Sequence, residues 1–179
     1  MSSDTIDRII ETAESQARTG GYNAFSFREI AKEIGIKSAS IHYHFPTKAD
    51  LAKALAHRYT EKFVEHLNTI SSDKSELHSQ LASYADLFYH ALKQDQKMCL
   101  CGLFAAEMDV LPDEVKKETR LFFEANLTWI ESILKTHGIG NTKTKAMNLL
   151  ANMEGAMLLG KAFESEEYFR QAIDLESFT

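Results

Sequence analysis

The chain has 179 residues, of which 44% are hydrophobic and 26% charged, and its net charge is −6. No apolar run approaches the roughly 20 residues that span a membrane, the first ten residues lack the pattern of a signal peptide, and two cysteines give no disulfide framework. Only two prolines and eight glycines interrupt the chain, which favours long helices over many short strands. We therefore expect an all-α, soluble, cytoplasmic protein.

Charge is unevenly distributed along the chain. Residues 1–60 carry a net charge of +1, and residues 61–179 a net charge of −7. Within 28–58, six basic residues accompany three acidic ones, so this stretch is locally +3. A basic segment on an acidic body is typical of a small nucleic-acid-binding unit, although solvated charged helix faces produce the same pattern.

The amino-terminal region predicts two helices joined by glycines. Apolar residues spaced as i, i+3, i+4 and i+7 predict a helix over 5–18, and Gly20-Gly21 follow as a helix stop. Ser26 and Glu29 have the spacing of a capping box, in which the serine hydroxyl accepts from an amide of the first turn. A second, short helix is therefore predicted to begin after Ser26.

A sharp turn and a third helix follow. Gly35 can adopt positive φ and turn the chain, with Ile36 buried in that turn. Ser38 is predicted to cap a helix over about 38–44, and Pro46 ends it because the residue before a proline disfavours the α region.

The rest of the chain is also predicted to be helical. Thr47 is expected to cap a long helix, Asp73 with Glu76 repeats a capping pattern, and Pro112 lies at a helix start, where its missing N–H costs nothing. The predicted helices cover about residues 48–70, 74–94, 99–109, 112–137, 142–162 and 165–176.

Residues 26–48 are the most informative segment. A short capped helix, a glycine turn, a second short helix and a proline stop have the arrangement of a helix-turn-helix. An ordinary corner between two helices has the same spacing, so the identities of the residues decide between the two.

The stretch GYNAFSFREIAKEIGIKSASIHYHFPTKADL resembles the DNA-binding signature of the TetR family, over about residues 6–55. This resemblance implies a helix-turn-helix domain at 1–47 and a larger helical ligand-binding and dimerisation domain at 48–179. It also implies a homodimeric repressor that binds a palindromic operator in double-stranded DNA and is released by a small effector. The matching positions are Gly21-Tyr22, Ser26, Ile30-Ala31, Gly35, His44-Phe45 and Lys48.

The same resemblance implies which side chains meet DNA. Residues 38–43 would enter the major groove, whose edges distinguish all four base pairs, and Lys37 is the candidate for a guanine. The small side chains there allow a close approach, and they are Ser38, Ala39 and Ser40. The expected contacts to the DNA backbone are Ser26, Tyr43, His44 and Lys48. The helix-turn-helix domain at 1–47 is called the head below. Its expected core is Ile30, Ala31, Ile34, Ile41 and Phe45.

One position departs from the family pattern. The family commonly has tyrosine where this chain has His42, and Tyr43 follows it. His42 could bond a phosphate or a guanine N7, and Tyr43 could supply the phosphate contact instead.

Residues 98–107, MCLCGLFAAE, are similar to a segment of one subgroup of the family, some of whose members respond to reactive electrophiles. Cys99 matches the subgroup cysteine, which implies a sensor thiol, whereas Met98 replaces the usual glycine. The alternative is that Cys99 and Cys101 are small buried hydrophobes. A metal site has less support, because no Cys/His spacing completes a zinc set.

The later helices offer candidate effector and dimer surfaces. Helix 142–162 is apolar nearly all round, and Gly155, Ala156 and Gly160 allow close approach, so it and the last helix are the predicted dimer interface. An apolar effector pocket is predicted between helices, with ordinary core packing as the alternative. Its candidate residues are Tyr84, Phe88, Tyr89, Cys99, Phe104, Met108, Phe122, Asn126, Trp129 and Met153.

The main rival function is an enzyme. The sequence has no P-loop, no G-x-G-x-x-G after a strand, no G-x-S-x-G and no H-E-x-x-H. We therefore predict no catalytic residue, cofactor, metal or membrane partner. A helical interaction module without specific DNA binding is the remaining alternative.

Overall fold

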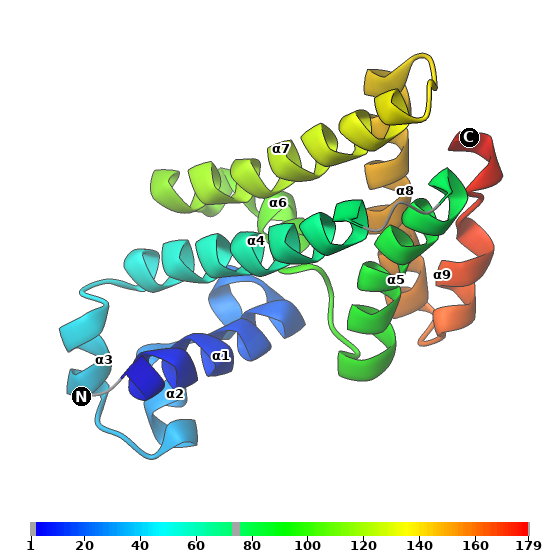
Figure 1. Ribbon diagram of the computed structural model, residues 1–179. Helices are drawn as coiled ribbons and strands as arrows, with labels where there is room; N and C mark the ends of the chain where they lie inside the picture. The colour runs from blue at the N-terminus through cyan, green and yellow to red at the C-terminus, as the bar shows by residue number, and fades with distance from the viewer. Residues whose placement is uncertain (1–2, 73–75, 179) are drawn as a thin grey trace. The chain divides into compact units, whose positions relative to one another are not determined.

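The computed structural model describes residues 3–72 and 76–178, and these contain helices and no β-strand (Figure 1). The all-α fold class is confirmed. No helix in the described ranges is long and apolar enough to cross a membrane. The elements in chain order are α1 (Ser3–Gly20), η1 (Tyr22–Ala24), α2 (Phe27–Ile34), α3 (Ser38–His44), α4 (Lys48–Ser72), α5 (Leu77–Asp95), α6 (Leu100–Ala106), η2 (Met108–Val110), α7 (Asp113–Thr136), α8 (Thr142–Ala162), α9 (Glu166–Ala172) and η3 (Glu176–Phe178).

The chain forms two compact units. The first comprises the chain up to Thr60 together with Leu100–Phe122, and the second comprises Glu61–Cys99 together with the chain from Phe123 onward. The first unit thus includes the head, the start of α4, all of α6 and the first part of α7. The division into domains at 1–47 and 48–179 stays a prediction.

The core of the first unit forms where α1 packs against α2 and α6, and α2 against α3. The apolar stripe predicted on the first helix is buried there, including Ile9, Ala13 and Ala17. Of the five residues expected in the core of the head, four are buried, whereas Ile34 at the end of α2 is half-buried. Ile36, expected to be buried in the turn, is also half-buried.

Local capping explains where the helices of the head begin and end. The Ser26 hydroxyl accepts from the Glu29 amide at 3.2 Å, as predicted. Gly35 ends α2 in the left-handed region with φ 73°. The predicted cap at Ser38 is wrong. Lys37 occupies the N-cap position in an extended conformation with no side-chain cap, and Ser38 is the first residue of α3.

The long helix α4 begins with a reciprocal cap. The Thr47 hydroxyl accepts from the Asp50 amide at 3.1 Å, and the Asp50 carboxylate accepts from the Thr47 amide at 2.9 Å. Thr47 is therefore confirmed as the cap. Asp50 is the partner that satisfies a second unpaired amide at this terminus.

In the second unit, α8 packs against α5 and α9, and the three helices lie side by side in Figure 1. Asp73 lies outside the described residues, and α5 has Glu76 at its N-cap without a side-chain bond. The last predicted helix is shorter than expected, because α9 ends at Ala172 and a 3₁₀ turn follows. The short helix α6 likewise ends at Ala106.

Candidate nucleic-acid interface and interior site

Helix α3 has an inner and an outer side. Ile41 and the following Phe45 are buried, which fixes the helix against the core of the head. The predicted DNA-contacting residues occupy the remaining positions: Lys37, Ala39, His42 and Tyr43 are exposed, and Ser38, Ser40 and His44 are half-buried. A run of three small residues is therefore flanked by longer polar ones on a surface open to a partner.

Tyr43 is the most prominent side chain of this surface. Its side chain is 79% exposed, an unusual environment for a large aromatic group, and its ring meets His44 edge-on at 5.0 Å. A phenol fixed in this way presents a hydroxyl that can donate to a phosphate. His42 lies beside it, with its ring 4.6 Å from Phe27 and its Nδ1 3.4 Å from the Pro46 carbonyl.

Two predicted backbone contacts have a more internal environment. The His44 Nε2 atom is buried and has no hydrogen-bond partner among the described residues, so this atom does not reach solvent. The Lys48 ammonium lies 4.6 Å from the ring centre of Tyr22 and 4.7 Å from that of Phe25. Burial lowers the pKa of Lys48, and the charge of Glu107 opposes that shift. Lys48 thus holds the start of α4 by cation–π contacts.

Glu107 is a residue that sequence reasoning missed. Its carboxylate accepts from the Tyr22 amide at 2.6 Å, across 85 residues of chain. Gly21 has φ +76°, and a Cβ atom there would lie 2.5 Å from both carboxylate oxygens. Only glycine therefore admits the acid at this point. Glu107, directly after α6, is therefore hydrogen-bonded to the segment between α1 and α2.

The amino-terminal helices of this chain match those of known DNA-binding regulators. The family model described as bacterial regulatory proteins, tetR family, matches residues 9–55. A TetR transcriptional regulator of known structure from Legionella pneumophila is 34% identical, over 96% of this chain and 94% of that one, with a TM-score of 0.91.

The chain belongs to the TetR family.

Two further relatives support this assignment. A TetR-family regulator of known structure from Agrobacterium tumefaciens is 29% identical over 94% of this chain and 93% of that one, with a TM-score of 0.90. The HTH-type transcriptional regulator YxaF of Bacillus subtilis is 25% identical over 87% of this chain and 84% of its own length. These relatives are transcriptional regulators, and none is described as an enzyme.

The predicted effector residues of this TetR-family chain fall into two groups. Phe104, Met108 and Phe122 belong to the first unit, where Phe104 and Phe122 are fully buried and Met108 is half-buried. The other residues belong to the second unit and are all buried, namely Tyr84, Phe88, Tyr89, Cys99, Asn126, Trp129 and Met153.

Aromatic rings form a packed cluster inside the second unit. Tyr84 stacks on Trp129 at 5.2 Å and meets Phe88 edge-on at 5.3 Å. The Tyr84 hydroxyl donates to Asn126 Oδ1 at 2.9 Å, and the Trp129 indole donates to the Leu67 carbonyl at 3.0 Å. The polar atoms of these rings are thus satisfied within the protein itself.

One half-buried acid next to this cluster is not satisfied in that way. Glu154 is the single acidic residue of α8, and burial raises its pKa to about 7, against the effect of a side-chain hydrogen bond with Cys99. Its Oε1 atom is buried and has no hydrogen-bond partner in the described part of the chain. Its signal in the sequence was an isolated acid in a largely apolar helix.

Both cysteines are buried, Cys99 at 1% exposure and Cys101 at 0%. Cys99 belongs to the second unit and Cys101 to the first. Cys99 lies outside the helix that was predicted to begin there, because α6 begins at Leu100. The described residues contain no group of three or more His, Cys, Asp or Glu side chains that could hold a metal ion.

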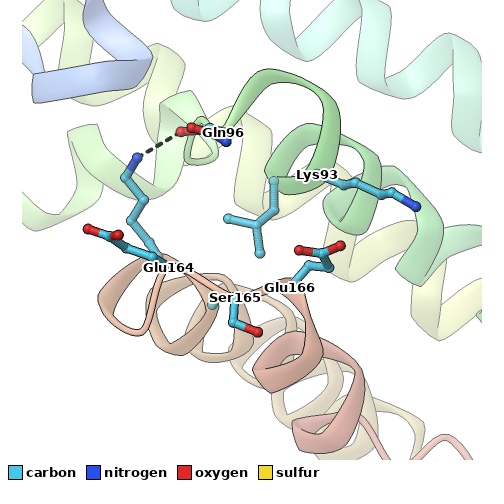
Figure 2. Close-up of a pocket in the computed structure, with 8 residues that line it drawn as sticks. Lys93, Gln96, Glu164, Ser165 and Glu166 are labelled. Atoms are coloured by element: carbon cyan, nitrogen blue, oxygen red, sulfur yellow. Dashed lines mark hydrogen bonds between the residues drawn. The ribbon is translucent and has the colours of Figure 1, made fainter.

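A polar surface cavity of about 370 Å³ lies where α8 gives way to α9 (Figure 2). Lys161 donates across it to the Gln96 carbonyl at 2.8 Å, and Lys93, Glu164 and Glu166 surround it. Positive and negative groups are mixed, so the cavity has no preference for one charge. Its floor includes Gly160, where a Cβ atom would collide with the Leu92 side chain.

Burial within the chain corrects the predicted dimer interface at two of its three small residues. Gly160 and Ala156 are buried within the chain's own second unit, whereas a Cβ atom at Gly155 would meet nothing within 4 Å. The open side of α8 and the loop after it carries large apolar side chains. They are Met147, Leu158 at 59% exposure, Leu159, and Phe163 stacked on Tyr168 at 4.3 Å.

Proposed function

We propose that this TetR-family chain is a transcriptional repressor that binds a palindromic operator as a homodimer and leaves it when a small effector binds. The observation that carries the proposal is the outer side of α3, with small side chains beside an exposed Tyr43. A helix of this kind can approach base edges closely while Tyr43 contacts a phosphate. As a regulator of bacterial DNA, the protein would act in the cytoplasm.

The open apolar side of α8 supports the homodimer. Apolar side chains as large as Leu158 and Phe163 are rarely this exposed together in a monomer, and a second copy of the same surface would cover them. A twofold axis through such an interface repeats the head, and two heads read an inverted repeat.

Three polar residues of the head and the start of α4 have distinct proposed roles. Lys37 is exposed at the start of α3 and remains the candidate for a guanine. Ser26 caps α2 with its oxygen as acceptor, so its hydroxyl hydrogen is free to donate to a phosphate. Lys48 would contact a phosphate from the position that it holds against Tyr22 and Phe25.

The effector is proposed to act in the second unit, on the aromatic cluster and Cys99. Because the cluster is densely packed, a ligand or a covalent adduct there displaces side chains and biases the second unit toward another conformation. If the operator-binding conformation is the one disfavoured, repression ends. An electrophile acting on Cys99 is the second form of this proposal.

A titration of duplex DNA from the region upstream of the protein's own gene tests the proposal, since such repressors often control neighbouring genes. Fluorescence anisotropy should show binding that exceeds binding to scrambled DNA by a thousandfold or more, about the usual specific range. Tyr43→Ala and Lys37→Ala should each weaken it. The control Lys143→Ala removes an exposed lysine of α8 and should leave it unchanged. Equal weak binding to every sequence would support an interaction module instead.

A further inference from the structure

The carboxyl group of Glu154 sits in an environment that suits a positively charged guest. One of its oxygens has no hydrogen-bond partner among the described residues, although that atom is buried. An uncompensated buried carboxylate is costly, and a cation with N–H donors removes much of that cost. The free acceptor is therefore a position that a ligand's ammonium group can fill.

The surroundings supply the apolar part of such a site. Burial raises the pKa of the Tyr84 hydroxyl, and the nearby charge of Glu154 raises it further. The Tyr84 ring stacks on Trp129 and meets Phe88 edge-on. Aromatic faces attract organic cations. Residues 61–179 also carry a net charge of −7, which favours cations over anions on approach.

We propose that Glu154 anchors the effector and that the effector is an organic cation, a protonated amine whose apolar part lies among the rings of Tyr84, Phe88 and Trp129. This deepens the proposed function, on which it rests. Because the rings are packed, the organic cation can enter only when side chains move. Binding is therefore coupled to a conformational change in the second unit. Cys99, which bonds the same carboxyl group, would face the guest.

Three small ligands of similar shape test the charge preference: 2-phenylethylammonium, neutral 2-phenylethanol and anionic 3-phenylpropanoate. Calorimetry on the full chain at pH 8 should show the cation binding at least tenfold more tightly than the alcohol, and the anion binding weakest. Glu154→Gln should remove the preference and leave alcohol binding unchanged. The matched control Glu166→Gln removes an exposed acid of α9 and should keep the preference.

The pH dependence gives a second readout. With its pKa about 7, the carboxyl group of Glu154 is mostly ionised at pH 8 and mostly neutral at pH 6, so cation affinity should fall roughly tenfold between these values. The titratable neighbours at this point are Cys99 and Tyr84. On the packed helices α5 and α9, the titratable side chains of Tyr84 and Tyr89 are buried. The other charged or titratable side chains there whose exposure is described are exposed, namely His78, Asp86, His90, Lys93, Glu166, Glu167, Tyr168 and Arg170.

Different results overturn the Glu154 site and the proposed repressor function. Suppose that the protein binds its upstream DNA but shows no preference for the cation at ligand concentrations up to millimolar. That result overturns the site assignment, and so does a Glu154→Gln variant that keeps the preference. A circular dichroism melt shows that the variant is folded, and Glu154→Asp, which keeps the charge, should retain part of the preference. If the protein binds no DNA specifically while the cation preference holds, the repressor assignment fails and the site stands.

Discussion

Lys48 makes a structural contact and has a proposed contact with DNA, and separate measurements distinguish the two. Its ammonium group lies over two aromatic rings at the start of α4, and such contacts stabilise by about 0.5–2 kcal/mol. Lys48→Ala should lower the free energy of unfolding by about 1 kcal/mol, as urea denaturation would show. Unchanged stability would mean that the contact contributes nothing.

The phosphate role of Lys48 predicts a different result from the same variant. Binding to all DNA sequences should weaken, and the slope of log affinity against log salt should fall by about 1, as for one lost phosphate contact. Titrations over several salt concentrations measure this. A variant that is less stable but has an unchanged slope would leave Lys48 with only its structural role.

The raised pKa of Glu154 makes stability depend on pH. Its pKa is about 7 in the folded protein against 4.5 ordinarily, so the folded state binds the extra proton between these values and stability is lost as pH rises through 7. The loss is at most about 3 kcal/mol. Urea unfolding of Glu154→Gln should therefore show a gain over the wild type at pH 8 that vanishes near pH 4. An equal difference at both pH values would contradict the assignment.

Cys99 stays a predicted sensor, with a condition that the structure adds. Its thiol is buried and shares a hydrogen bond with the carboxyl group of Glu154, so a reagent reaches it only when the surrounding side chains move. A maleimide should react slowly, and it should release the wild type from DNA but not Cys99→Ser. Release that persists in Cys99→Ser would return the thiol to the core.

Among contacts between elements, the hydrogen bond between Glu107, directly after α6, and the Tyr22 amide can be tested by one substitution. Glu107→Gln keeps the shape of the side chain and removes its charge, so the bond to the Tyr22 amide weakens. Stability should fall by about 1–2 kcal/mol, and operator affinity should fall with it because the loop before α2 loosens. The matched control Glu124→Gln, on the exposed side of α7, should change neither. Wild-type affinity in Glu107→Gln would exclude this contact from DNA binding.

Sequence reasoning succeeded where the determinants of an element are local. Ser26, Gly35 and Thr47 act within a few residues, and the helices around them begin and end close to their predicted bounds. It failed where partners are distant: Glu107 meets Tyr22 across 85 residues. The orientation of Gly160 toward Leu92 likewise follows from the packing of α8 on α5, which no spacing within α8 encodes.

For the whole molecule, the proposed homodimer depends on the open side of α8. Leu158→Glu places a charge in the proposed interface, where burial without a partner is strongly unfavourable, so the protein should become monomeric by light scattering at micromolar concentration. Val110→Glu, at a site 67% exposed in η2, is the control and should remain dimeric. Gly160→Glu is uninformative here, because it disrupts the chain's own packing. A monomeric wild type would contradict the model of paired half-sites.

In the proposed dimer, two α3 helices read an inverted repeat. Selection of binding sites from a random duplex library with the purified protein tests this reading. It should enrich a palindrome whose half-sites are one or more helical turns apart. Recovery of an unenriched library, or of a single asymmetric site, would contradict it.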